Sequence, residues 1–254
     1  MRINDYFKRC SFIYLLFFAF FLSLALSSCA PVKKPEQPPL LTIPKRSNAR
    51  HIVAPGETLW RLSKMYDVPI ANIVKANRLD GQAPLKMGQE LTIPNANEIR
   101  PVISLFPSYK WQYIIIHHSA TDEGSSLSFN KSHLAKGWDK GVGYHFVIDN
   151  PTNRKQDGQI EVTPRWLKQE DGAHCKASDM NVKAIGICLV GNFHRDRPSK
   201  EQMDSLVFLV DKLRRFYHIP LKNILRHGHV PTSATECPGN NFPWDSFIRR
   251  LKNN

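Results

Sequence analysis

The sequence predicts an α/β protein in which a central mixed β-sheet is flanked by helices, preceded by a small strand–helix–helix–strand domain. Three near-continuous apolar runs of strand length, at residues 111–116, 143–148 and 185–190, are typical of strands buried on both faces of a sheet. A capping box opens a long apolar stripe at helical spacing over residues 199–217. Strands interleaved with helices indicate the α/β class.

The composition excludes several broad classes of protein. The 254 residues are 42% hydrophobic and 10% aromatic and include 5 Cys, which excludes wholesale disorder, a coiled coil and a disulfide scaffold. The formal net charge is +13. The basic residues are scattered, with no basic helix and no array of stacking aromatics, so no nucleic-acid partner is expected. A polyanionic wall or membrane surface accounts for the charge better.

The first 28 residues have the layout of a secretory signal. Basic residues precede an uncharged apolar run at 11–26, and small residues follow it. The run is 16 residues long, shorter than the roughly 20 needed to cross a bilayer, which favours a cleaved signal over an uncleaved membrane span. Removing residues 1–28 takes away three basic residues and one acid and leaves a net charge of +11.

The segment Leu26-Ser27-Ser28-Cys29 resembles the lipobox of bacterial lipoproteins. The resemblance implies that Cys29 is acylated and anchors the mature chain in a lipid bilayer; the alternative is an incidental cysteine at an ordinary cleavage site. Ala30 is not the aspartate that favours retention in the inner membrane, which suggests the periplasmic face of the outer membrane. Residues 29–50, with five prolines and no apolar periodicity, predict a semi-extended tether rather than a Pro-rich recognition ligand.

Residues 51–94 form a domain of their own. Apolar spacing predicts a strand at 51–53, helices at 59–66 and 70–76, and a closing strand at 91–93. This pattern alone indicates a minimal core and says nothing of function.

The residues of this domain resemble a lysin motif (LysM) from end to end, at 55–60, 76–79 and 87–94. The resemblance implies binding of N-acetylglucosamine-containing glycans in a groove between the loop after the first strand and the loop before the last. The glycan contacts that it implies are Gly56, Glu57, Thr58, Leu59, Leu79, Asp80 and Gly81. The alternative is that Gly56 and Thr58 only form the turn and the helix cap, and that Leu59 belongs to the core.

A linker at 95–107 precedes a third segment, residues 108–254, whose histidines and cysteines suggest metal chemistry. His117 follows a predicted strand, and open α/β sheets place their sites at the carboxyl ends of strands. His229 and Cys237 lie eight positions apart in a later loop. Two His and one Cys suit zinc, with a fourth position left for water, although ten histidines allow many accidental pairings.

Five segments resemble, in order and rough spacing, the zinc N-acetylmuramoyl-L-alanine amidases, a family that includes phage lysozyme-type amidases and peptidoglycan recognition proteins. They lie at residues 116–121, 143–146, 172–174, 185–191 and 235–239. The resemblance implies one zinc ion and hydrolysis of the amide that joins N-acetylmuramic acid to L-alanine in peptidoglycan or in muropeptides. The rival implication is a non-catalytic peptidoglycan-recognition protein, and a purely structural zinc would need a fourth protein ligand.

The resemblance also assigns the residues around the zinc. It implies the ligands His117, His229 and Cys237, with His229 preferred over His227 because of the family's spacing to the cysteine. It places Tyr144 beside the attacking water and the Thr235 hydroxyl near the developing oxyanion. A tyrosine, with an ordinary pKa of about 10, is a poor general base, so Tyr144 is expected to orient the water or to donate a hydrogen bond.

Other polar residues of this segment have structural or open roles. Cys188 stands where one branch of the family has a glutamate base, and a cysteine there is expected to be a buried strand residue. His174 and Asn181 lie in a loop that borders the stem peptide in the family, so substrate contact and a place in the core are both open. His118 and His145 are expected to be structural, because neighbours in extended chain point to opposite sides. A Cys175–Cys188 disulfide is left open, and no protein partner is predicted.

Overall fold

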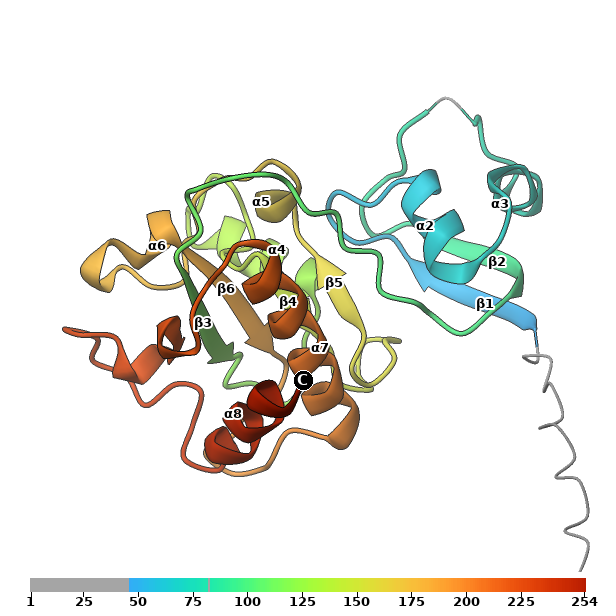
Figure 1. Ribbon diagram of the computed structural model, residues 1–254. Coiled ribbons are helices and arrows are strands. Elements are labelled where there is room, and N and C mark those ends of the chain that lie inside the picture. Colours follow the sequence, from blue (N-terminus) through green and yellow to red (C-terminus); the bar gives the residue numbers. More distant parts are fainter. Residues whose placement is uncertain (1–45, 82) are drawn as a thin grey trace, which may run out of the picture. The chain divides into compact units, whose positions relative to one another are not determined.

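The computed structural model of the chain describes residues 46–81 and 83–254 (Figure 1). The predicted signal sequence, Cys29 and nearly all of the predicted tether lie outside these residues. Within the described part of the chain, no helix is both long and apolar enough to cross a membrane.

The first domain has the predicted strand–helix–helix–strand order. Strand β1 (Ser47–Ile52) pairs antiparallel with β2 (Glu90–Ala96), and helices α2 (Leu59–Tyr66) and α3 (Ile70–Asn77) lie between them in the chain. The core of this domain is a cluster of fully buried apolar side chains that includes Val53, Leu62, Ile73, Leu91 and Ile93.

Both ends of this domain extend beyond the predicted bounds. β1 begins at Ser47, so residues 47–50, predicted as the end of the tether, form part of the sheet. They were missed because they carry no apolar periodicity; backbone pairing such as Ala49↔Ile93 holds them instead. At the other end, Ile99 and Val102 of the predicted linker pack on the core of this domain. Farther along the same linker, Ile103, Leu105 and Phe106 pack on the core of the second domain.

The second domain is built on a five-stranded sheet in the order β5-β4-β6-β3-β7 (Figure 1). The strands are β3 (Tyr113–His118), β4 (Phe146–Ile148), β5 (Ile160–Val162), β6 (Ala184–Leu189) and β7 (Ile224–Arg226). β3, β4, β6 and β7 run parallel, and only β5 is antiparallel. The predicted mixed sheet is therefore confirmed.

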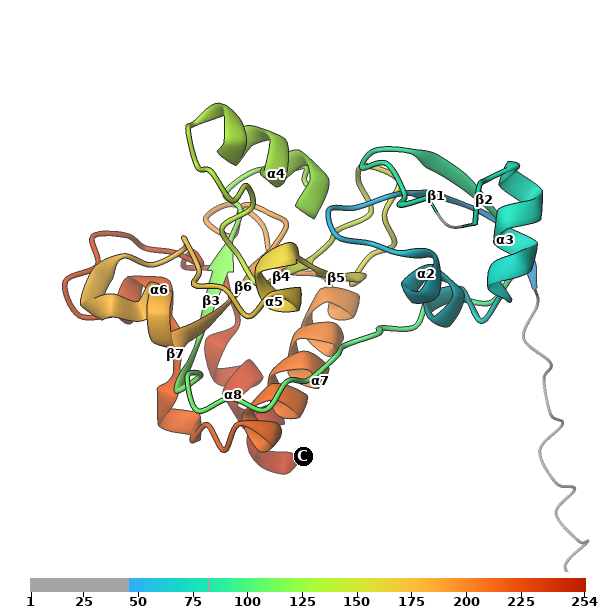
Figure 2. The same ribbon diagram turned by 90° about the horizontal axis from the view of Figure 1, so that it is seen from above.

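Helices lie on both sides of this sheet. α7 (Lys200–Phe216) and α8 (Trp244–Asn253) lie on one side, and Figure 2 shows α4 (Ser126–Ala135) on the other. The short helices α5 (Pro164–Leu167) and α6 (Met180–Lys183) precede β6. The predicted capping box at the start of α7 is present, with Ser199 and Gln202 bonding each other's backbone N–H groups.

The alternation of side chains along β3 decides which face carries the site. Ile114 and Ile116 belong to the core cluster that contains Leu206 and Leu213 of α7. Ile115 belongs to a separate cluster on the opposite face. His117, the next residue after Ile116, therefore points away from α7.

Candidate metal centre

Three side chains from distant parts of the sequence meet at the end of β3. His117, His227 and Cys237 are the only group of three or more potential metal ligands among residues 46–81 and 83–254, and their donor atoms all lie within 4.8 Å of one another. Nδ1 of His117 is 3.8 Å from Sγ of Cys237. Zinc bonds of about 2.0 Å to nitrogen and 2.3 Å to sulfur, at a tetrahedral angle, separate two such atoms by roughly 3.5 Å. The donor set and its spacing fit zinc.

The structure corrects one predicted ligand: His227, and not His229, completes the group. β3 and β7 are parallel neighbours whose last pair is Ile116↔Arg226, so His117 is the next residue of β3 and His227 directly follows the end of β7. Paired residues of adjacent strands point to the same face. The two imidazole rings accordingly lie 4.6 Å apart, centroid to centroid.

His229 lies two residues farther on, at the end of a single 3-10 turn (His227–His229), and its side chain is exposed. A two-residue step in such a turn rotates the side chain by about 240°. The sequence does hold a signal for His227, since it follows the short apolar strand Ile224-Leu225 just as His117 follows its own strand. The spacing to Cys237 was preferred over this signal, and that choice was wrong.

Burial prepares the two histidines for metal binding. It is the main cause that lowers the pKa of His117 well below its ordinary value, and it also lowers the pKa of His227. Both rings are therefore neutral near pH 7 and keep a lone pair for a metal ion.

Burial shifts the pKa of the Cys237 thiol in the opposite direction from the two histidines. Burial raises the pKa of Cys237 to about 12, although the backbone N–H of His118, 3.4 Å from the sulfur, lowers it. Without a cation the thiol keeps its proton, so metal binding must release one.

Tyr144 and Thr235 lie beside these ligands, as predicted. The ring of Tyr144 is 5.3 Å from that of His117, centroid to centroid. Burial, together with the Cys188 and Cys237 thiols, raises the pKa of Tyr144 well above its ordinary value, so the hydroxyl keeps its proton. Oγ1 of Thr235 accepts a hydrogen bond from the backbone N–H of Cys237 at 3.2 Å, which leaves the hydroxyl proton available for donation.

Cys188 is the buried strand residue that the sequence predicts. It lies in β6 directly beside His117 in the strand register and is fully buried. Burial raises the pKa of its thiol well above the ordinary value, so Cys188 cannot act as a base near neutral pH. Cys175 and Cys188 are both free thiols, and the disulfide left open by the sequence does not form.

His174 and Asn181, the predicted substrate contacts, are engaged in internal bonds. His174 is 8% exposed, and its Nδ1 lies 3.1 Å from Nε2 of His117. Oδ1 of Asn181 accepts the backbone N–H groups of His174 and Cys175, both at 2.8 Å. Both polar groups thus shape the surroundings of His117. Of the two places that the sequence left open for His174, the structure shows the one in the core.

The other histidines of this region are structural. Nδ1 of His118 accepts the backbone N–H of Phe193 at 3.1 Å, on the α7 side of the sheet. Nδ1 of His145 accepts the N–H of Gly186 at 2.9 Å. Both predictions are confirmed. His133, which the sequence analysis did not weigh, accepts the N–H of Gly143 at 3.0 Å and so holds the residue before Tyr144.

In the first domain, the predicted glycan contacts divide into exposed and buried groups. Glu57 is buried, and its Oε2 bonds Nε2 of His51 and the backbone N–H of Ala54, each at 2.7 Å. The predicted glycan contact by this carboxylate is therefore corrected to an internal one. Leu59 and Leu79 pack on the core. The remaining predicted contacts are exposed at the surface: Gly56, Thr58, Asp80 and Gly81.

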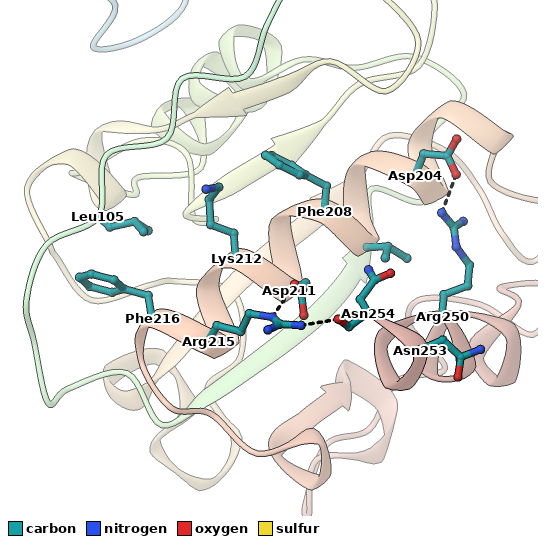
Figure 3. A pocket seen from close by; sticks show the side chains of 11 residues that line it. Leu105, Asp204, Phe208, Asp211, Lys212, Arg215, Phe216, Arg250, Asn253 and Asn254 are labelled. Carbon is teal, nitrogen blue, oxygen red and sulfur yellow. Dashed lines mark hydrogen bonds and ion pairs between the residues drawn. The ribbon is translucent and has the colours of Figure 1, made fainter. Parts of the chain in front are cut away.

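A groove lies along α7 and α8 and shares no residue with the metal centre (Figure 3). Four of its charged side chains form ion pairs, Arg215 with Asp211 at 2.7 Å and Arg250 with Asp204 at 2.6 Å, and Nζ of Lys212 lies 5.6 Å from the ring centroid of Phe208. Its lining contains no histidine or cysteine, so it offers no metal ligands of those kinds. The apolar part of the groove is formed by Leu105, Val207, Phe208 and Phe216.

Two family models match separate parts of the chain. Residues 107–240 match the N-acetylmuramoyl-L-alanine amidase family (Amidase_2), and residues 51–94 match the LysM domain. The first match covers more than half of the chain. The chain therefore belongs to the N-acetylmuramoyl-L-alanine amidase family, and it also carries a LysM domain.

Individual relatives include peptidoglycan-recognition proteins. Peptidoglycan-recognition protein 2 of Holotrichia diomphalia is 31% identical over 102 residues, which is 37% of this chain and 49% of the relative. Peptidoglycan-recognition protein LB of Drosophila melanogaster is 33% identical over 138 residues, 50% of this chain and 54% of the relative. The chain thus spans about half the length of each.

Among solved structures, the N-acetylmuramoyl-L-alanine amidase LysC from Clostridium intestinale is 31% identical. The match covers 61% of this chain and 95% of that one, with a TM-score of 0.47.

Proposed function

We propose that this chain is a zinc-dependent N-acetylmuramoyl-L-alanine amidase that cleaves peptidoglycan or muropeptides. The observation that carries the proposal is the cluster of His117, His227 and Cys237 with the Tyr144 ring beside it, in a chain of the amidase family. A recognition protein that only binds peptidoglycan has no need of a complete ligand set, whereas hydrolysis does. A structural zinc would need a fourth protein ligand, and the described residues offer three in this cluster.

The ligands would hold one zinc ion, which supplies a Lewis acid for the scissile carbonyl and makes hydroxide available at neutral pH. Tyr144 keeps its proton and donates a hydrogen bond to the oxygen that gains negative charge. Thr235 donates a second one, and a single donor of this kind contributes roughly 3 kcal/mol to transition-state stabilisation. The bond cleaved is the amide between the lactyl group of N-acetylmuramic acid and L-alanine.

The test is digestion of purified peptidoglycan, followed by mass spectrometry of the products. We expect stem peptides that begin with a free L-alanine amine, and glycan strands that carry a free lactyl carboxylate. A chelator should abolish both products and added zinc should restore them, whereas Cys237→Ser should stay inactive at the same zinc concentration. Binding of peptidoglycan by zinc-loaded protein without cleavage would instead support the recognition function.

We further propose that the LysM domain binds the N-acetylglucosamine-containing glycan of the wall. The surface exposure of Gly56, Thr58 and Gly81 supports this, whereas the Glu57 carboxylate is occupied by its internal bonds. Titration of the full chain with N-acetylglucosamine oligomers should shift the NMR signals of the Gly56, Thr58 and Gly81 amides. Shifts confined to the amidase domain would contradict this role.

The lipid anchor is proposed from the lipobox alone. Cys29 would carry lipid and hold the mature chain at the periplasmic face of the outer membrane. Cys29→Ala should then release the protein from membranes in cell fractionation. A Cys29→Ala protein that stays membrane-bound and unprocessed would instead indicate an uncleaved signal anchor.

A further inference from the structure

His174 joins the ligand His117 to the protein backbone. Its Nδ1 lies 3.1 Å from Nε2 of His117, and its Nε2 lies 3.3 Å from the carbonyl oxygen of Ala184. Nδ1 of His117 is the atom that faces Cys237. The two imidazole rings are therefore linked in series, with a backbone carbonyl at one end and the metal centre at the other.

The hydrogens of this chain of contacts follow from its two ends. A carbonyl oxygen only accepts, so Nε2 of His174 must carry a proton. A neutral imidazole has one N–H, which makes Nδ1 of His174 an acceptor. Nε2 of His117 must then be the donor, and the lone pair of His117 is left on Nδ1. This is the nitrogen that points at the cysteine ligand.

We propose that His174 is a positioning residue: by accepting the Nε2–H of His117 from a fixed place, it selects the tautomer and orientation in which His117 Nδ1 binds the metal. The inference rests on the proposed zinc centre and adds a role for a side chain that does not itself bind the ion. Partners of this kind also raise the basicity of a ligating histidine.

The surrounding backbone is built closely around the His174 ring. A Cβ atom at Gly186 would lie 2.3 Å from Cδ2 of His174, and one at Gly172 would lie 2.4 Å from the same atom. No side chain fits at either position without displacing the ring. The backbone N–H of His174 is held in addition by Oδ1 of Asn181 at 2.8 Å. The ring is thus held by residues from two separate segments of the chain.

The test compares two substitutions at the same position. In His174→Asn the side-chain oxygen lies close to the place of Nδ1 and can still accept from His117, whereas His174→Phe keeps the shape of the ring and has no acceptor. We expect the zinc affinity of the intact protein, measured by competition with a chromogenic chelator, to fall about 10- to 100-fold in His174→Phe. It should stay within about threefold of the unmodified protein in His174→Asn. His133→Phe, which changes a nearby histidine that does not bond His117, should also stay within about threefold.

A second measurement needs no substitution. Long-range ¹H–¹⁵N spectra of the zinc-free protein, with ¹⁵N-labelled histidine, should show both His117 and His174 protonated at Nε2. Protonation of His117 at Nδ1 would overturn the inference, as would a folded His174→Phe protein with unchanged zinc affinity, or a folded His174→Asn protein as weak as His174→Phe. Failure of the unmodified protein to bind zinc would refute the proposed function instead, and the tautomer measurement would still decide the role of His174.

Discussion

Replacing His227 and His229 one at a time tests which of the two histidines binds the metal. The two histidines are two residues apart, but only His227 has a ring nitrogen within 4.8 Å of the donors of His117 and Cys237. Zinc held by four protein ligands is bound by about 10–16 kcal/mol, which is roughly 3 kcal/mol for each ligand. Loss of one ligand should therefore weaken binding by about 100-fold or more. His229 is exposed, so its loss should change the affinity less than about threefold.

The assay is zinc competition with a chromogenic chelator on His227→Ala and His229→Ala, with hydrolysis of muropeptides measured on the same samples. His227→Ala should lose both zinc and activity, and His229→Ala should keep both. Circular dichroism serves as the control for folding. The reverse ranking, with His229→Ala the weaker zinc binder, would refute the argument from the β3–β7 register.

Three further predictions concern the hydroxyl at the site and the LysM domain. Tyr144→Phe should keep stoichiometric zinc, while kcat falls by about 100-fold or more with little change in KM; loss of zinc, or a near-normal kcat, would contradict the assigned role. Removal of residues 46–102 should weaken wall binding and leave hydrolysis of small soluble muropeptides nearly intact, because the two domains have separate apolar cores. An equal loss of activity on intact wall and on soluble muropeptides would show that the two domains do not act separately. Burial alone would raise the pKa of Glu57, but the hydrogen bond and charge of His51 hold this pKa below the ordinary value of 4.5. The pair therefore stabilises the LysM domain above pH 4.5, and its contribution is lost as the pH falls through the lowered pKa of Glu57. In hydrogen exchange of the β1 and β2 amides, Glu57→Gln should therefore be less protected than the unmodified chain at pH 7, with a difference that shrinks below about pH 4.5; a difference that does not change with pH would rule out this ionic contribution.

Local sequence patterns were sufficient for the fold class, and they indicated His117 and Cys237, two of the three residues of the candidate metal centre. The runs around Ile115, Val147 and Ile187 are nearly continuous apolar segments, and such runs are typical of strands covered on both faces, so the central strands of the sheet were predictable. His117 was predictable because it directly follows such a run. The resemblance at residues 235–239 supported Cys237 and zinc and added the role implied for Thr235.

The third ligand and the roles of the buried polar residues depend on contacts between segments far apart in the chain. His227 and His229 are equivalent in composition and nearly so in position, and only the pairing of β7 with β3 decides which of them lies beside His117. The LysM resemblance implied glycan contact for Glu57, and the amidase resemblance left substrate contact and a place in the core both open for His174. The structure instead places each against a histidine from elsewhere in the chain, 2.7 Å and 3.1 Å away.

The sequence by itself therefore determined the order of elements in the LysM domain, the strands β3, β4 and β6, and the helix α7. It also determined which residue types are available for metal binding, because apolar periodicity and side-chain chemistry are local properties. The tertiary structure decided which of the available histidines lies with His117 and Cys237 in the candidate metal centre, and which one bonds His117. The first depends on the register of β7 against β3, and the second on the close approach of Gly172 and Gly186 to the His174 ring. Spacing along the chain encodes neither of these contacts.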